Sequence, residues 1–262
     1  MGWNDMFNYA FKNYLKGFKE FLPFIVINLI FDLVVLKIFS VPLGGDKLIR
    51  AIEVGEEIDW SKVFTSPEFG NFSIVFVVIL IISLLVAPII NSYITLVIKK
   101  LLNNKEVKHL ELLKESFHYY FSYIGVTLAI ILILCGLAII IGLIAVYIPV
   151  LGVIAAIPGG IFILYLGVVY NPCTAYLIYN NCGVYDALQG GKQVGKKYFW
   201  PLLGFLIVIN VISKILSLVD TSYILIYIII TLIVFAKEIL ACTYLTALCK
   251  NYNEPEIKSD YE

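Results

Sequence analysis

Arginine is almost absent from this chain of 262 residues, which contains Arg50 and no other arginine. Nineteen basic residues are matched by nineteen acidic ones, so the formal net charge is zero. Proteins that bind the phosphate backbone of nucleic acids gather lysine and arginine into a strongly positive surface. The composition therefore predicts no nucleic-acid partner.

The sequence patterns of common catalytic and metal sites are also missing. The chain has only two histidines, His109 and His118, and it contains no HExxH, GxSxG or GK[ST] pattern. Its five cysteines include no CxxC pair, and we expect them to pack as small apolar side chains. They are Cys135, Cys173, Cys182, Cys242 and Cys249. We therefore predict no enzymatic activity, no metal site and no cofactor.

Apolar residues, by contrast, are abundant and occur in long runs. They make up 61% of the chain, and the mean hydropathy is +0.93. From Phe72 to Ile98 no residue is charged, and this run exceeds the roughly 20 residues that a helix needs to cross a bilayer. Because hydrocarbon cannot hydrogen-bond to peptide groups, each such run must form a helix. The sequence predicts an all-α polytopic membrane protein.

Six apolar runs predict six transmembrane helices in one integral membrane domain. The domain is expected over residues 1–252, with spans near 21–41, 72–98, 123–147, 159–180, 201–219 and 222–249, an outer loop at 42–71 and a short polar tail at 253–262. Ser66 followed by Pro67 indicates that the second helix begins before its apolar run. Two prolines and a glycine pair predict a short interfacial or re-entrant turn at 148–160.

The positive charges are distributed unequally between the two sides of the predicted bundle. One side has Lys12, Lys16, Lys19, Lys99, Lys100, Lys105, Lys108, Lys114, Lys192, Lys196, Lys197, Lys250 and Lys258. The other side has Lys47, Arg50 and Lys62, in an outer loop that is rich in acids. Cytoplasmic loops collect lysine and arginine, so we predict a plasma-membrane protein with both termini in the cytoplasm.

Three lysine-bearing amphipathic segments precede the odd-numbered spans, at residues 3–21, 106–121 and 183–201. Each ends in aromatic residues, as is typical of a helix that lies in the headgroup layer before the chain enters the membrane. The even-numbered spans end alike, with Tyr93, Tyr176 and Tyr244 as candidate equivalents. Two interpretations are open. The chain is a three-fold repeat of amphipathic helix plus transmembrane hairpin, or it shows the ordinary gathering of aromatic and lysine residues at membrane interfaces.

Polar side chains inside the predicted spans are the first candidates for a functional site, because placing them in hydrocarbon is costly. Asp32 in the first span and Lys214 in the fifth lie at similar depths, so they can pair. The pair can steady the bundle or act as a gate, and loss of one partner is destabilising in both cases. Four asparagines can line a polar path or hydrogen-bond between helices. They are Asn28, Asn91, Asn171 and Asn210.

The segment from Tyr170 to Leu203, YNPCTAYLIYNNCGVYDALQGGKQVGKKYFWPLL, resembles a pattern found in bacterial and archaeal membrane proteins. The pattern is a proline near the end of a span, a polar turn, an alanine and leucine pair that opens an amphipathic helix, and an aromatic re-entry. Those places are taken by Pro172, Gly183, Ala187, Leu188, Phe199 and Trp200. The chain is similar in this respect to YciC-like proteins and to the membrane domain attached to some glycerophosphodiester phosphodiesterases. The resemblance implies the six-span fold and no established activity, and Gly190 stands where relatives carry a basic or serine residue.

The expected function is a non-catalytic role in organising lipid, a partner or the membrane, with the bilayer and a bound lipid or protein as partners. The alternative is a small-solute or ion transporter that uses Asp32 and Lys214. Three parallel repeats are typical of mitochondrial carriers, but the charged proline signature of those carriers is missing, since Pro23 is followed by FIVIN. A water-accessible cavity that reaches both charged residues would favour transport, and a filled interior would favour the non-catalytic role.

Overall fold

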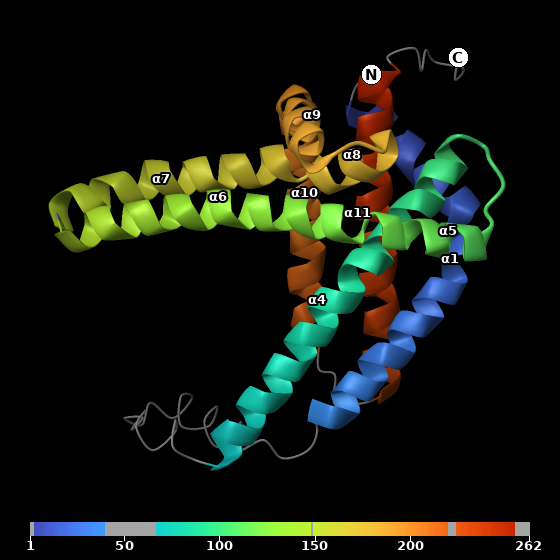
Figure 1. Cartoon of the computed structure of the whole chain (residues 1–262), viewed down its shortest axis with the longest axis horizontal. Coiled ribbons are helices and arrows are strands. Elements are labelled where there is room, and N and C mark those ends of the chain that lie inside the picture. The colour runs from blue at the N-terminus through green and yellow to red at the C-terminus, as the bar shows by residue number, and fades with distance from the viewer. Residues whose placement is uncertain (1–2, 40–66, 148, 220–223, 255–262) are drawn as a thin grey trace. The chain divides into compact units, whose positions relative to one another are not determined.

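The computed structural model describes residues 3–39, 67–147, 149–219 and 224–254 (Figure 1). Every regular element in these ranges is an α-helix, which confirms the predicted fold class for this part of the chain. The helices are α1 (Trp3–Phe39), α4 (Pro67–Leu102), α5 (His109–His118), α6 (Tyr120–Tyr147), α7 (Pro149–Tyr170), α8 (Cys173–Asn180), α9 (Val184–Lys197), α10 (Phe199–Ser217) and α11 (Ile224–Asn253).

Five segments of these helices are long and apolar enough to cross a membrane, as expected of an all-α polytopic membrane protein. They are Leu84–Leu102, Tyr120–Tyr147, Ala156–Asn180, Phe199–Leu216 and Leu225–Asn253, and they correspond to the second through sixth predicted spans. The predicted first span falls on the C-terminal part of α1, where most side chains lie outside the described residues. Most of the predicted outer loop and tail lie outside them as well. The predicted helix start at Pro67 is confirmed.

The structure corrects the extent of the predicted turn at 148–160, because residues 149–160 are helical. Helix α6 continues to Tyr147, α7 already begins at Pro149, and Pro158 lies inside α7. The first residue of a helix needs no hydrogen-bond donor, so proline suits the start of α7. Inside hydrocarbon a helix is the conformation that satisfies the backbone, and this requirement outweighs the single hydrogen bond that Pro158 removes.

The chain forms two compact units. The smaller one contains Leu22–Ala87, and the larger one contains Met1–Phe21 together with Pro88–Glu262. In the smaller unit, Phe24 and Asn28 of α1 are buried, and the Asn28 side-chain amide donates a hydrogen bond to the Phe24 carbonyl oxygen at 3.0 Å. The contacts that suggest a functional site lie in the larger unit.

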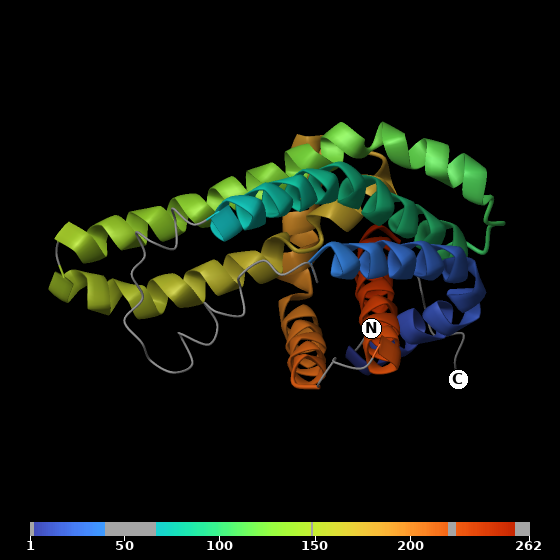
Figure 2. The same ribbon diagram turned by 90° about the horizontal axis from the view of Figure 1, so that it is seen from below.

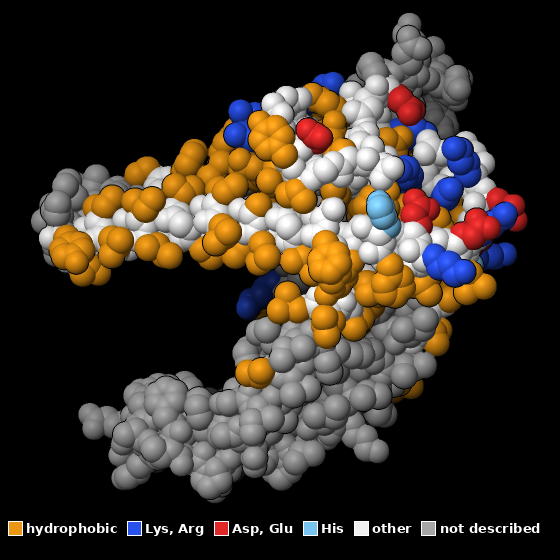
Figure 3. Space-filling view, in the orientation of Figure 1, with side chains coloured by type: hydrophobic (Ala, Val, Ile, Leu, Met, Phe, Trp, Pro, Cys, Tyr) orange, Lys and Arg blue, Asp and Glu red, His pale blue; other side chains and the backbone are white. Residues whose placement is uncertain are grey.

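Helices α6 and α7 form a hairpin in the larger unit and run side by side in both views (Figures 1 and 2). Val126 is the buried residue of α6, and hydrophobic side chains cover the visible face of the hairpin (Figure 3). A helix that is apolar on all sides is typical of one that is surrounded by lipid. Helix α5 precedes this hairpin, as α9 precedes α10 and α11, whereas the first predicted amphipathic segment continues into the following span as one helix, α1.

The core of the larger unit lies where α8 meets the C-terminal parts of α4 and α11. Val97, Leu177 and Ala247 are fully buried there, one from each of the three helices. The Tyr244 ring stacks on Phe205 of α10, with the ring centres 4.2 Å apart. This packing brings the ends of α4, α8 and α11 close together.

Candidate functional site

Two helices of the larger unit end at a pair of asparagines. Asn103 and Asn104 follow α4, and Asn180 and Asn181 lie at the end of α8. Asn104 and Asn181 both have a φ of 50°, and in the described part of the chain no other residue besides glycine has a positive φ. Asparagine adopts this left-handed conformation more readily than most residues and ends helices for that reason. A short helix, α5 or α9, then follows each pair.

Lysines of neighbouring helices donate hydrogen bonds to backbone carbonyls at these two helix ends. Lys250 of α11 donates to the Leu102 carbonyl oxygen of α4 at 2.6 Å, and Lys99 of α4 donates to the Ile178 carbonyl oxygen of α8 at 3.0 Å. The last carbonyls of a helix have no partner within the helix and carry partial negative charge, so an ammonium group stabilises them. The two lysines thereby link α11 to α4 and α4 to α8.

Each helix hairpin is also tied to the segment that precedes it. Lys16 Nζ donates a hydrogen bond to Asn104 Oδ1 at 3.0 Å, and the Tyr119 hydroxyl donates one to Asn181 Oδ1 at 2.9 Å. Asn251 Nδ2 donates to the Tyr198 hydroxyl at 2.9 Å. Tyr119 follows α5 and Tyr198 follows α9, so the two tyrosines hold equivalent places. Lys16 makes a comparable connection from within α1, and the three-fold repeat stays a prediction. The helix-end network comprises Lys16, Lys99, Lys250, Asn104, Asn181, Asn251, Tyr119 and Tyr198.

The Tyr119 hydroxyl is suited to its role as a donor in this network. Burial raises its pKa above the ordinary value of tyrosine, and the Glu115 carboxylate and the Cys182 thiol raise it further. Tyr119 therefore stays protonated at physiological pH, and its hydroxyl donates a hydrogen bond to Asn181 Oδ1. The pKa of Cys182 is raised as well, first by burial and then by the Asp186 carboxylate, so this thiol is a weak nucleophile.

His109, the first residue of α5, joins three segments of the larger unit. Its Nε2 lies 3.1 Å from Glu20 Oε2 of α1, and its Nδ1 lies 2.6 Å from the Tyr93 hydroxyl oxygen of α4. In a neutral imidazole one nitrogen donates a hydrogen bond and the other accepts one. If Nε2 donates to the carboxylate, Nδ1 accepts a hydrogen bond from the tyrosine hydroxyl. Both ring nitrogens are thus occupied, and the contact holds α5 against α1 and α4.

Glycine allows α9 to lie directly on α7 and α8. A Cβ atom added at Gly195 would stand 2.0 Å from the Val169 carbonyl oxygen, and one at Gly191 would stand 2.4 Å from Cys173 Cα. Ordinary Cβ atoms never come so close to backbone atoms, so only glycine permits this approach. This function of the glycines could not be predicted, because nothing near them in the sequence identifies the surface that they contact.

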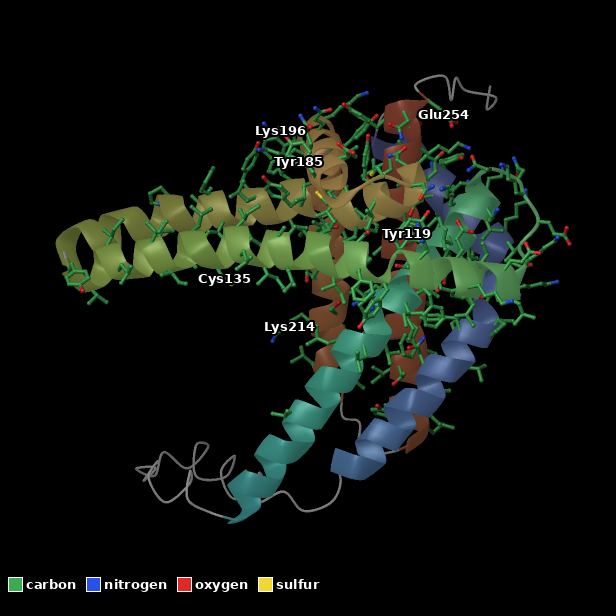
Figure 4. All side chains as sticks on the ribbon, in the orientation of Figure 1. Tyr119, Cys135, Tyr185, Lys196, Lys214 and Glu254 are labelled. Atoms are coloured by element: carbon green, nitrogen blue, oxygen red, sulfur yellow. The ribbon has the colours of Figure 1, made fainter. Side chains whose placement is uncertain are left out.

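The Asp32 and Lys214 pair stays a prediction. The side chain of Asp32 lies outside the described residues. Lys214 lies in the last turn of α10 with an exposed side chain (Figure 4). Sequence reasoning missed a polar contact nearby, in which Lys237 Nζ of α11 donates to Ser213 Oγ of α10 at 2.5 Å. The position of Ser213 beside Lys214 is the only sequence signal for this contact.

The four predicted asparagines occupy different environments. Asn28 and Asn210 each donate to the carbonyl oxygen four residues earlier in their own helix, at 3.0 Å and 2.8 Å. Asn91 lies in α4, where its backbone carbonyl oxygen accepts a hydrogen bond from the Thr95 hydroxyl at 2.8 Å. Asn171 lies in the turn between α7 and α8, where its backbone N–H donates three residues back at 3.3 Å. Within the larger unit, Asn91, Asn171 and Asn210 therefore have different hydrogen-bond partners.

The cysteines and the acidic side chains of the described residues form no metal site. All five cysteines are free, and Cys173 and Cys249 are buried. Within the described ranges, no group of three or more His, Cys, Asp or Glu residues is placed to hold a metal ion. The helix-end network and the His109 contacts are therefore the arrangements from which a function can be argued.

No protein-family model, curated protein or solved structure that was compared with the chain matches it.

Proposed function

We propose that this chain is a non-catalytic integral membrane protein that organises lipid at the cytoplasmic leaflet of the plasma membrane, with both termini in the cytoplasm. The observation that carries the proposal is the helix-end network. It joins the ends of α4, α8 and α11 to one another and to the segments that precede the hairpins. Hydrogen bonds that are linked in this way fix a polar layer next to the apolar helices.

The exposed lysines support anionic lipid as the partner of this polar layer. Lysines gather over α9 and around α5 on the visible face of the molecule (Figure 3). Lys105, Lys108 and Lys196 are exposed there. The anionic lipids of a cytoplasmic leaflet attract each lysine near the surface by about 1 kcal/mol. Several such lysines on a fixed layer would enrich anionic lipid around the protein, and the lysine bias of the whole sequence favours the cytoplasmic side.

The test is the lipid dependence of thermal unfolding. We expect the full-length protein to unfold at a higher temperature in nanodiscs that contain phosphatidylglycerol than in nanodiscs of phosphatidylcholine alone. High salt should reduce the difference, because it screens exposed charges. Native mass spectrometry should detect anionic lipid retained on the purified protein. Equal unfolding temperatures together with no retained anionic lipid would contradict the proposal.

Orientation needs its own measurement. In sealed right-side-out vesicles, an external protease should leave the C-terminal tail intact, since the proposal places it inside. An inside-out preparation is the control, and there the tail should be removed. Cleavage of the tail in the right-side-out vesicles would show that it lies outside the cell and would contradict the proposed orientation.

Transport is the second candidate function, and the contact between Lys237 and Ser213 favours it. Ser213 and Lys237 lie in helices that are long enough to span a membrane, and ionisable side chains within spans commonly mark ion or proton pathways. On this hypothesis, proteoliposomes should show an ion or proton flux that Lys237→Gln or Asp32→Asn abolishes. An unchanged flux in both variants would exclude a pathway through these residues.

The resemblance to YciC-like proteins stays an expectation. It is compatible with the non-catalytic proposal, because that resemblance implies a membrane fold and no established activity.

A further inference from the structure

Helix α9 presents one fixed face and one open face. Its buried face consists of small residues that pack on α7 and α8, as described above. Tyr185 and Lys196 lie on the open face, where the Tyr185 side chain is 75% exposed (Figure 4). They are about three helical turns apart, at 3.6 residues per turn, so they point in nearly the same direction. The open face is therefore held at one position and is free to meet a ligand.

The lysines of α9 have no acidic neighbour within ion-pair distance among the described residues. They are Lys192, Lys196 and Lys197. Asp186 is the acidic residue of α9, and it lies in the first turn, away from Lys196 and Lys197 in the last turn. The C-terminal end of α9 therefore carries positive charge that is free to attract an anion.

Aromatic rings hold two of these ammonium groups in place. Lys197 Nζ lies 5.3 Å from the centre of the Tyr198 ring and 5.1 Å from that of Tyr252. Lys192 Nζ lies 5.6 Å from the centre of the Tyr170 ring. A cation–π contact positions an ammonium group without cancelling its charge. The charge of Lys197 is thus fixed next to the exposed charge of Lys196.

Trp200 follows these lysines closely in the sequence, at the start of the next apolar helix. It is the second residue of α10, at the start of the span Phe199–Leu216, and its side chain is 73% exposed. Phe199 lies between the Trp200 ring and the Tyr165 ring of α7, with ring centres 5.3 Å and 5.2 Å away. Tryptophan is enriched at the headgroup level, where its ring meets acyl chains and its N–H meets polar groups.

From the exposed lysines at the end of α9 and the exposed tryptophan at the start of α10, we infer that the exposed surface around the α9–α10 junction binds the headgroup of an anionic glycerophospholipid. Lys196 and Lys197 contact the phosphate as point charges, and Trp200 packs at the boundary between the headgroup and the acyl chains. The inference rests on the proposed function and assigns the lipid to one place. Diffuse attraction to all exposed lysines is the alternative that the experiment must exclude.

The experiment uses Trp200 as the reporter. In the full-length protein, Trp3→Phe and Trp60→Phe leave it as the only tryptophan. Nanodiscs of phosphatidylcholine receive a small fraction of either brominated phosphatidylglycerol or brominated phosphatidylcholine, and the two quenching efficiencies give the preference for anionic lipid. Each lysine that contacts the headgroup should raise the local ratio of phosphatidylglycerol to phosphatidylcholine at Trp200 by roughly five-fold, which corresponds to about 1 kcal/mol.

Two variants with equal loss of charge separate a site from diffuse attraction. Lys196→Gln with Lys197→Gln should lose the preference at Trp200. Lys105→Gln with Lys114→Gln should retain it, because those exposed lysines belong to α5 and the segment before it and form no ion pair in the described part of the chain. Arginine at 196 and 197 keeps the charge and should restore the preference. Circular dichroism and the unfolding temperature in phosphatidylcholine nanodiscs establish that each variant is folded.

The outcomes distinguish the site from the function. An equal loss of preference in both glutamine variants would overturn the site, while anionic stabilisation of the unmodified protein would still support the proposed function. Absence of any preference at Trp200, with anionic stabilisation present, would also overturn the site. Absence of both effects would overturn the function and the site together.

Discussion

Gly195 of α9 lies so close to α7 that its replacement tests the packing of the amphipathic helix. A methyl group at this position would stand 2.0 Å from the Val169 carbonyl oxygen and 2.7 Å from the carbonyl carbon. Both atoms belong to the backbone, so no side-chain rotation can remove the overlap. Helix α9 would have to move away from α7 as a whole.

Helix propensity alone predicts the opposite effect of this change. Alanine in place of glycine inside a helix is stabilising by about 1 kcal/mol. Overpacking in a close-packed interior costs about 1 to 3 kcal/mol. Because the overlap at Gly195 involves backbone atoms, we take the upper end of that range. Gly195→Ala should then lower the free energy of unfolding by about 2 kcal/mol.

The assay is equilibrium unfolding in detergent micelles, with circular dichroism as the measure of the folded fraction. Gly167→Ala is the matched control, because Gly167 lies in α7 near Val169 and an added Cβ there meets no atom within 4 Å. The control should be as stable as the unmodified protein or slightly more stable. If Gly195→Ala is also at least as stable, then α9 does not pack on α7 at this distance.

Three further predictions concern the polar contacts of the larger unit. A double-mutant cycle with Glu20→Gln and His109→Gln should give a coupling free energy of about 0.5 to 1 kcal/mol in unfolding experiments, since both side chains are partly exposed; a coupling near zero would mean that the contact is not stabilising. Asp186→Asn should accelerate maleimide labelling of Cys182, measured by mass spectrometry at pH 8, because removal of the carboxylate lowers the raised pKa of the thiol; slower labelling would contradict that sign. Tyr119→Phe should cost about 1 kcal/mol of unfolding free energy through loss of one hydrogen bond, and a variant of unchanged stability would show that this contact is dispensable.

The positions of the described spans could be predicted because the bilayer leaves the backbone few choices. A long run without charge must be helical, and proline after serine marks a helix start, so the beginning of α4 at Pro67 follows from local sequence. The same principle corrects the predicted turn at 148–160. Proline and glycine favour a turn in water, whereas the apolar surroundings keep α7 helical through Pro158.

The contacts of the candidate site could not be predicted in the same way, because they depend on tertiary packing. The glycines of α9 lower helix propensity, and only the nearby backbone of α7 and α8 explains why they are present. The asparagine pairs did offer a local signal. Asn103 with Asn104 and Asn180 with Asn181 each separate an apolar run from an amphipathic segment, as a left-handed helix end would require.

The lysines show why a count of charges predicts orientation better than it predicts a binding surface. The count treats all lysines alike, yet Lys99 and Lys250 each donate to a backbone carbonyl at a helix end. Their charge stabilises the protein's own helix dipoles and is less available to lipid headgroups. Lys196, in contrast, is exposed and has no acidic partner in the described part of the chain. Substitution of Lys250 should therefore affect folding more than lipid preference, and substitution of Lys196 should do the reverse.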